Sequence, residues 1–188
     1  LECREALAMP GDEHTAIILR RVIAVEGEAR VRVILDPRAD FGKHGMSHLT
    51  QEDGRWTARC GSLYLRWSGA ANAKVTENGR LEVELRVRSE RQHDLVLEVS
   101  DRPLHGRPPE ADELWDATAT TWAAGSTVSG TIADRDAGHA VAVLRGMTSS
   151  GGGMVAGATM SLPERFKQGR NYDYRYAWIR DQCYKGQA

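Results

Sequence analysis

The sequence has no excess of charge of either sign and no long apolar run. Its 25 Lys and Arg stand against 26 Asp and Glu, which gives a formal net charge of −1. Nucleic-acid-binding domains usually carry a basic excess on one face, so this balance does not support a nucleic-acid partner. No stretch approaches the roughly 18 apolar residues of a membrane span, so a membrane partner is not indicated either. The first residues, Leu1-Glu2-Cys3-Arg4-Glu5, do not have the pattern of a signal peptide.

Cysteine is also scarce. Cys3, Cys60 and Cys183 are far apart in the chain and form no CxxC pair. An odd, unclustered set is typical of free thiols in a reducing compartment, so we expect a cytoplasmic protein. The chain begins with Leu rather than Met and stops in what reads as the start of a helix, so we expect a fragment of a longer protein.

Residues 1 to about 100 have the pattern of β-strands. Apolar and polar side chains alternate clearly over 29–35, which is typical of a half-buried strand, whereas the apolar run 14–19 indicates a strand buried on both faces. The turns Glu26-Gly27 and Asn78-Gly79 predict β-hairpins. Short strands at close spacing predict a mainly β fold, an antiparallel β-sandwich. The expected strands are residues 14–25, 29–35, 55–59, 63–67, 73–76, 81–87 and 93–99.

Prolines punctuate the chain after residue 102, and the pattern then changes from strand to helix. Apolar residues at helical spacing predict one helix over 110–122 and a second over 134–147. Helices that follow a run of strands predict a linker or the start of another domain, and we assign a helical linker to 103–148. Packing of the first helix explains Trp115 and Trp122 better than sugar binding does.

Aromatic residues gather near the C-terminus, where 172, 174, 176 and 178 are Tyr, Tyr, Tyr and Trp. In an extended chain these four side chains would line one face, and Asp181 would suit the N-cap of a helix from Gln182 onward. One interpretation is an ordinary strand that uses Tyr and Trp for their β-propensity. The other is a carbohydrate site, because aromatic rings stack on the apolar face of a sugar ring. Arg180 and Asp181 then offer hydrogen-bond donors and acceptors to its hydroxyls.

Two further patterns do not indicate a site. Residues 149–153 are Ser-Ser-Gly-Gly-Gly, but they lack the Gly-Lys-Ser/Thr ending of a phosphate-binding loop, which favours a simple turn. His44 and His48 are four residues apart, yet Gly42 and Gly45 indicate a loop, and no third ligand is evident. We therefore predict no metal site and no cofactor.

Three segments carry a family resemblance. Residues 158–164 read Ala-Thr-Met-Ser-Leu-Pro-Glu, residues 170–181 read Arg-Asn-Tyr-Asp-Tyr-Arg-Tyr-Ala-Trp-Ile-Arg-Asp, and residues 37–42 read Pro-Arg-Ala-Asp-Phe-Gly. They resemble the A-T-T-S-L-P-E, R-N-W/Y-D-Y-R-Y-x-W-x-R-D and P-R-x-D/G-Y/F-G segments of glycoside hydrolase family 15. The family includes glucoamylases, glucodextranases and bacterial or archaeal trehalases. Met160 departs from the usual second Thr, which leaves the fine substrate preference open.

The resemblance implies an N-terminal β-supersandwich, a helical linker and an (α/α)6 barrel. On this chain the sandwich would be residues 1–102, without its first strands, the linker would be 103–148, and the barrel would start over 149–188.

The resemblance also implies how a sugar would be held. Arg180 and Asp181 would bind the hydroxyls of a non-reducing terminal glucose, with Tyr174 and Trp178 against its ring, which implies exo-action. Catalysis in the family is inverting and uses two glutamates as general acid and base. The last glutamate of this chain, Glu164, matches neither position. We therefore assign no catalytic residue and expect the 188-residue chain alone to be inactive.

The leading hypothesis is thus a fragment of an inverting, exo-acting α-glucoside hydrolase with a carbohydrate substrate, either an α-glucan or trehalose. The alternative is a non-catalytic carbohydrate-binding or assembly module, in which the sandwich serves packing or homo-oligomerisation. Two suitably placed glutamates downstream of this chain would support the enzyme, and their absence would support the module.

Overall fold

The computed structural model describes residues 1–124, 130, 133–158 and 172–185. The chain forms two compact units, residues 1–121 and 122–188. The strands are β1 (Glu2–Leu7), β2 (Thr15–Ile23), β3 (Ala29–Leu35), β4 (Met46–Glu52), β5 (Arg55–Cys60), β6 (Leu63–Ser68), β7 (Lys74–Val75), β8 (Leu81–Val87) and β9 (Gln92–Ser100). The helices are α1 (Ala111–Ala123), α2 (Asp134–Gly146) and α3 (Ile179–Lys185).

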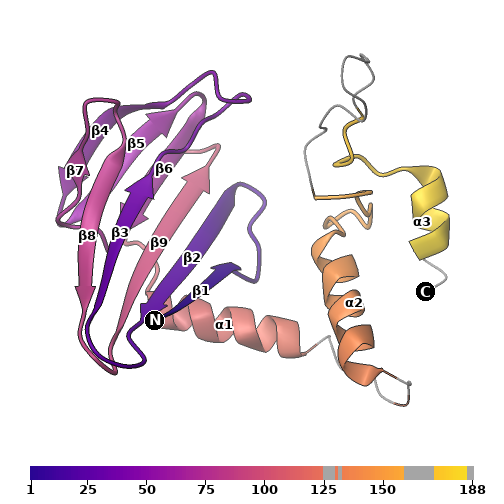
Figure 1. Ribbon diagram of the computed structural model, residues 1–188. Coiled ribbons are helices and arrows are strands. Elements are labelled where there is room, and N and C mark those ends of the chain that lie inside the picture. The colour runs from indigo at the N-terminus through magenta and orange to yellow at the C-terminus, as the bar shows by residue number, and fades with distance from the viewer. Residues whose placement is uncertain (125–129, 131–132, 159–171, 186–188) are drawn as a thin grey trace, which may run out of the picture. The chain divides into compact units, whose positions relative to one another are not determined.

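The strands form two antiparallel sheets, a large one in the order β1-β2-β9-β6-β5-β4 and a small one in the order β3-β8-β7 (Figure 1). Their apolar faces meet in a core where Trp67 and Leu95 of the large sheet pack with Val33, Leu81 and Leu85 of the small sheet. Along β8 every second side chain is buried, as the alternation predicts. The antiparallel sandwich followed by helices is therefore confirmed. The division at residues 102 and 148, and the start of a barrel at 149, stay predictions.

One expected hairpin is confirmed and the other is wrong. β7 pairs with β8 across the turn at Asn78-Gly79, where Gly79 has a φ of 71°. β2 and β3 belong to different sheets, because β2 pairs with β1 and β9 whereas β3 pairs with β8. The turn at Glu26-Gly27 therefore carries the chain from one sheet to the other. A turn reverses the chain, but it does not determine which strands will pair with the two strands that it joins.

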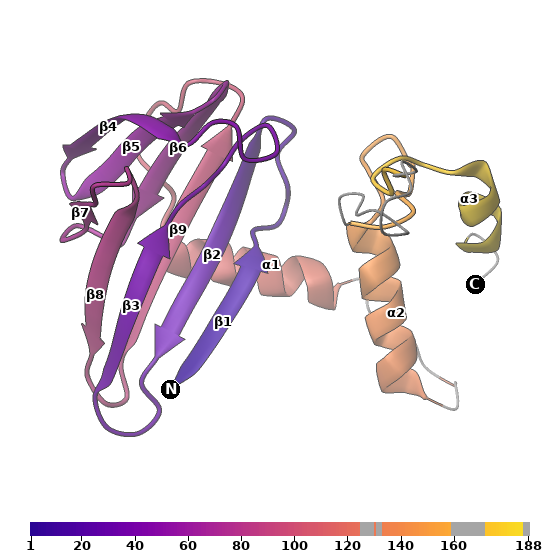
Figure 2. The same ribbon diagram turned by 45° about the horizontal axis from the view of Figure 1, so that its top comes forward.

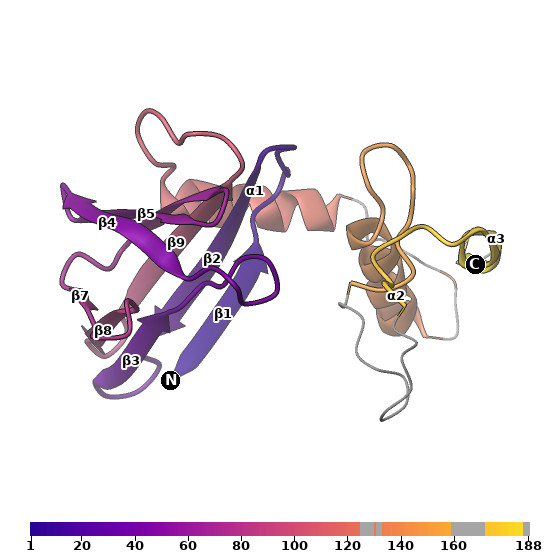
Figure 3. The ribbon, with the colours of Figure 1, turned by 90° about the horizontal axis from the view of Figure 1, so that it is seen from above.

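Helix α1 covers the outer face of the large sheet, on the side away from β3 and β8 (Figure 2). Seen from above, the small sheet and α1 lie on opposite sides of the large sheet (Figure 3). Trp115 packs against the buried Leu19 and Val96, which confirms its predicted packing role. Its indole N–H also donates to Asp94 Oδ1 at 3.1 Å, and the same carboxylate accepts two hydrogen bonds from Arg21 at 2.8 and 2.9 Å.

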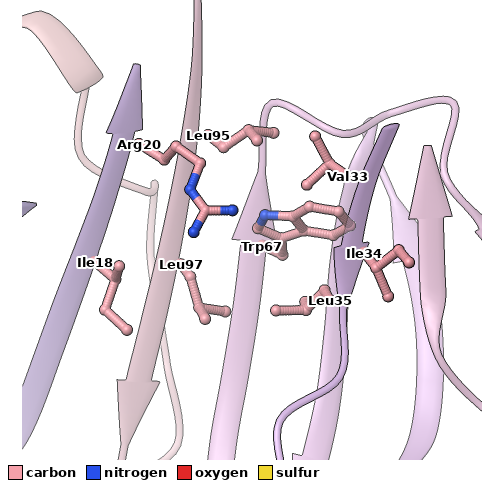
Figure 4. Close-up of a pocket in the computed structure, with 8 residues that line it drawn as sticks. All are labelled: Ile18, Arg20, Val33, Ile34, Leu35, Trp67, Leu95 and Leu97. Carbon is pink, nitrogen blue, oxygen red and sulfur yellow. The ribbon is translucent and has the colours of Figure 1, made fainter. Parts of the chain in front are cut away.

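The sandwich opens beside β3, at the edge of the small sheet. A hollow of about 180 Å³ lies there, lined by Ile18, Leu35, Trp67 and Leu97 among others (Figure 4). Ile18 is 43% exposed, so the expectation that this strand is buried on both faces is wrong at this position. The lining is mainly aliphatic, and its charged member, Arg20, is paired with Glu5 at 2.5 Å. The hollow therefore lacks the mixture of free donors and acceptors that a sugar requires.

The three cysteines are free thiols, as expected, with Cys60 buried and Cys3 and Cys183 exposed. Within the described part of the chain, no helix is long and apolar enough to cross a membrane.

Candidate functional site

The aromatic stretch near the C-terminus forms a turn followed by a helix, not an extended strand. The chain turns at Tyr174 to Tyr176, and α3 begins at Ile179. The prediction that Asp181 caps a helix starting at Gln182 is therefore wrong, because Asp181 lies within the first turn of α3. A carboxylate is still favoured there, since the first turn lies at the positive end of the helix dipole.

Asp173 closes this turn. Its Oδ1 accepts hydrogen bonds from the backbone N of Arg175 at 3.0 Å and from the Arg175 Nε at 2.9 Å, and its Oδ2 accepts from Nη2 at 2.6 Å. An Asp side chain that binds the backbone two residues further on competes with strand formation, which explains the departure from an extended chain. The side-chain hydrogen bond from Arg175 is the main reason why the pKa of Asp173 falls from 3.8 to about 2.

A second backbone segment supports the turn. The Gly157 N–H donates to the Tyr174 carbonyl at 2.8 Å, and the Ala156 N–H donates to the Tyr176 carbonyl at 3.1 Å. On α3, the side-chain amide of Gln182 donates to the Met154 carbonyl at 3.0 Å. These three hydrogen bonds hold the turn and the helix against the same short segment, residues 154–157.

The turn, the helix and this segment surround a hollow of about 270 Å³. Its lining residues are Ala156, Tyr172, Tyr174, Trp178, Arg180 and Asp181. The structure thus brings together all four residues that the sequence proposed for sugar binding. Sites for drug-sized ligands usually have about 300–1,000 Å³, so this hollow suits one small ring.

Two of the aromatic residues behave differently from the sequence expectation. Tyr172 was not proposed for the site, yet it lines the hollow and meets Trp178 edge to face, with ring centroids 5.7 Å apart. Tyr176 shares the even spacing but is 69% exposed and is not among the lining residues. The turn at 174–176 ends the period-two alternation, so the last tyrosine of the series leaves the common face. The even spacing could have pointed to Tyr172, but not to the loss of Tyr176.

Polar groups beside the hollow have unused hydrogen-bonding capacity. Among the described residues, the buried Trp178 Nε1 and Asp181 Oδ2 have no hydrogen-bond partner. Arg180 Nη2 lies 3.6 Å from that oxygen, which is too long for a hydrogen bond. The Arg180 side chain is 75% exposed. A buried polar atom without a partner costs about 1–3 kcal/mol, so the site would gain from a ligand rich in both donors and acceptors.

Part of the resemblance lies outside the described residues, namely 159–164, which include Glu164, and 170–171. Residues 37–42 belong to the sandwich unit, where the Ala39–His44 bridge closes a loop. Within the described ranges, no group of three or more His, Cys, Asp or Glu side chains is placed to hold a metal ion.

Comparison with known proteins gives matches over most of the chain and within the site segment. The family model for glycosyl hydrolases family 15 matches residues 139–188. A trehalase of Mycobacterium tuberculosis is 28% identical over 181 residues, which cover 89% of this chain and 26% of that protein. A trehalase of Thermoplasma acidophilum is 44% identical over 85 residues, 45% of this chain and 14% of that protein. Trehalase 2 of Sulfolobus acidocaldarius is 49% identical over 37 residues, 20% of this chain and 6% of that protein.

No solved structure matches the chain. The chain spans about a quarter of the length of the Mycobacterium tuberculosis trehalase that it resembles. The segment that matches the family model contains all six residues that line the hollow. Over residues 139–188, this chain is thus similar to glycosyl hydrolases family 15.

Proposed function

We propose that this chain supplies the site for a terminal glucose unit in a glycoside hydrolase that cleaves trehalose. One observation carries the proposal. Tyr174, Trp178, Arg180 and Asp181 line a single hollow, although a turn and a helix start lie between them in the chain.

The chemistry of the lining suits a sugar ring. A pyranose has an apolar C–H face, which packs on aromatic rings, and hydroxyls around its edge. Arg180 can donate to these hydroxyls and Asp181 can accept from them, and such charge-assisted hydrogen bonds are among the stronger ones. Trp178 Nε1 adds a donor that no described residue uses. A hollow of about 270 Å³ supports the binding of one ring, with the rest of the substrate outside, and hence exo-action.

We favour trehalose as the substrate because the five curated relatives are all named trehalases. The similarity to one of them extends over 89% of this chain, well beyond the site segment. An α-glucan remains the second candidate, since its non-reducing end presents the same glucose ring to the hollow.

The reaction itself requires groups beyond this site. Inverting hydrolysis needs a general acid at the leaving oxygen and a general base for water, with their carboxyl groups about 6.5–9.5 Å apart. We assign Asp181 to hydroxyl binding and place both the acid and the base outside these 188 residues. The chain alone then binds the terminal glucose but does not cleave the glycosidic bond.

The test uses the full-length protein with trehalose, maltose and a longer α-glucan. We expect glucose release from trehalose. Inversion at the α-glycosidic bond should release one glucose as its β-anomer, which NMR detects before the anomers equilibrate. Arg180→Ala and Asp181→Ala should each lower kcat/KM by about 100-fold or more, because each removes a charged partner of the hydroxyls. Tyr184→Phe is the matched control on the same helix, since Tyr184 is 72% exposed and does not line the hollow.

Two outcomes would count against the proposal. Glucose release by the purified 188-residue chain would place the acid and base within it. Binding of the sugars by the full-length protein without cleavage of any of them would support the non-catalytic module instead.

A further inference from the structure

The wall of the hollow depends on a residue that does not line it. We propose that Asp173 is a positioning residue for sugar binding, which holds Tyr174 in place through its contacts with Arg175. This inference rests on the proposed function, because it assigns a role within the same site.

The geometry of the turn supports this role. Both carboxylate oxygens of Asp173 are used, one by the backbone N and Nε of Arg175 and the other by its Nη2, at 2.6–3.0 Å. The hydrogen bond from the Arg175 backbone N to Asp173 fixes the reversal of the chain directly around Tyr174. On the other side, the Tyr174 carbonyl accepts from the Gly157 N–H at 2.8 Å. The residue that carries the ring is therefore held from two independent directions.

Three other ion pairs among the described residues have the same sequence spacing and provide a comparison. Glu2–Arg4, Glu28–Arg30 and Asp36–Arg38 are joined through side-chain atoms at 2.6, 2.8 and 2.9 Å. In the Asp173–Arg175 pair, the carboxylate also binds the backbone amide of the arginine. The pair at the site thus shapes the chain, in addition to joining two side chains.

Substitutions of Asp173 should separate the contribution of its hydrogen bond to the Arg175 backbone from the contribution of its negative charge. Asn retains an oxygen for the Arg175 backbone N and so can keep the turn, but it loses the negative charge. Ala loses both. We expect KM for trehalose to rise about tenfold in Asp173→Ala and about two- to threefold in Asp173→Asn, in line with the loss of a charge-assisted hydrogen bond. The kcat should stay within about twofold, because Tyr174 contacts a ring that is bound in both the ground state and the transition state.

The experiment measures kcat and KM of the full-length protein and its variants, together with trehalose Kd by calorimetry. Glu28→Gln is the matched control, since it weakens an exposed pair of equal spacing in the sandwich, and its KM should equal that of the wild type. If Asp173→Ala does not fold, Asp173→Ser replaces it, because Ser forms the same turn more weakly.

The outcomes are distinct for the two proposals. An unchanged KM in Asp173→Ala, or a lower kcat at unchanged KM, overturns the positioning role. An equal rise in KM for Asn and Ala overturns the part assigned to the turn. A wild-type protein that binds trehalose without cleaving it overturns the proposed hydrolysis, and the order of the Kd values still decides the role of Asp173. A protein that neither binds nor cleaves the sugar overturns both.

Discussion

The indole ring of Trp178 meets the ring of Tyr172 edge to face, with their centroids 5.7 Å apart and their planes at 74°. Tyr172 precedes the turn and Trp178 follows it, so this contact joins the two ends of the loop that forms the hollow. An aromatic pair in this geometry contributes about 0.5–1.5 kcal/mol beyond the area that it buries. The contact therefore supports the shape of the hollow as well as providing two of its walls.

Replacement of Trp178 by Phe should separate sugar binding from folding. The phenyl ring can keep the contact with Tyr172, and the lost indole N–H has no hydrogen-bond partner among the described residues. We expect the free energy of unfolding to change by less than about 1 kcal/mol, while KM for the sugar rises several-fold, roughly as for one lost hydrogen bond. Thermal unfolding and steady-state kinetics measure the two effects. Lower stability at unchanged KM would mean that the indole N–H serves the fold.

The buried ion pair between Arg66 and Glu98 should be critical for stability. Their side chains are 9% and 5% exposed and joined at 2.6 and 2.7 Å, and Arg66 also donates to the Gly106 carbonyl at 2.9 Å. Glu98→Gln leaves a buried guanidinium without its counter-charge, which typically costs about 3–5 kcal/mol. Urea unfolding of the variant measures this loss.

Its control is an exposed pair with the same two-bond geometry. Arg32 and Glu82 are joined at 2.6 and 2.7 Å, with side chains 62% and 28% exposed. Exposed pairs contribute about 0–1 kcal/mol, so Glu82→Gln should have little effect on the free energy of unfolding. Equal losses in the two variants would contradict the role assigned to burial.

Gly69 should not tolerate a side chain. It has a φ of 85°, and a Cβ atom there would lie 2.0 Å from the Asp94 carbonyl oxygen. We expect Gly69→Ala to cost more than about 3 kcal/mol, because backbone strain and a steric clash add. Gly79 has a φ of 71° with nothing within 4 Å of the added atom, so Gly79→Ala should cost only about 1 kcal/mol. Similar unfolding midpoints for the two variants would contradict the clash.

The Asp173 carboxyl should titrate well below an ordinary aspartate. Its pKa is lowered to about 2 in the folded chain, mainly by the Arg175 side chain, so the ionised form is the one stabilised. The contribution of the pair to stability is therefore fully present above the ordinary value of 3.8 and is lost as the pH falls through about 2. An NMR titration of this carboxyl measures the midpoint, and Arg175→Met should move it back toward 3.8. A wild-type midpoint near 3.8 would contradict the observed contact.

Two strands were not predicted, because they lie at the edges of the large sheet. β1 and β4 are its two outermost strands, and most of their side chains are exposed. An edge strand needs no apolar face along its whole length, so the alternation that identified β3 and β8 is weak there. In β4 the pattern is also interrupted, since His48 has a φ of 51° and the pairing shifts between Ser47 and Thr50.

The candidate site likewise has features that the sequence reveals and features that it does not. Its residue types could be recognised from the sequence, because rings followed by an adjacent Arg and Asp form a local pattern. The even spacing also includes Tyr172, but the exclusion of Tyr176 could not be recognised, since it follows from the turn that Asp173 closes. The hydrogen bonds from Ala156 and Gly157 to the turn could not be predicted either, because these residues are about twenty positions away from it in the chain.

The sequence by itself determined where most strands and the first two helices lie, because alternation and helical spacing are properties of neighbouring residues. It also determined which four side chains offer rings, a cation and a carboxylate near the C-terminus. Only the tertiary structure decided that β2 and β3 part into different sheets and that those four side chains surround one hollow. Both outcomes depend on hydrogen bonds and packing between residues distant in the chain, and no local pattern specifies such partners.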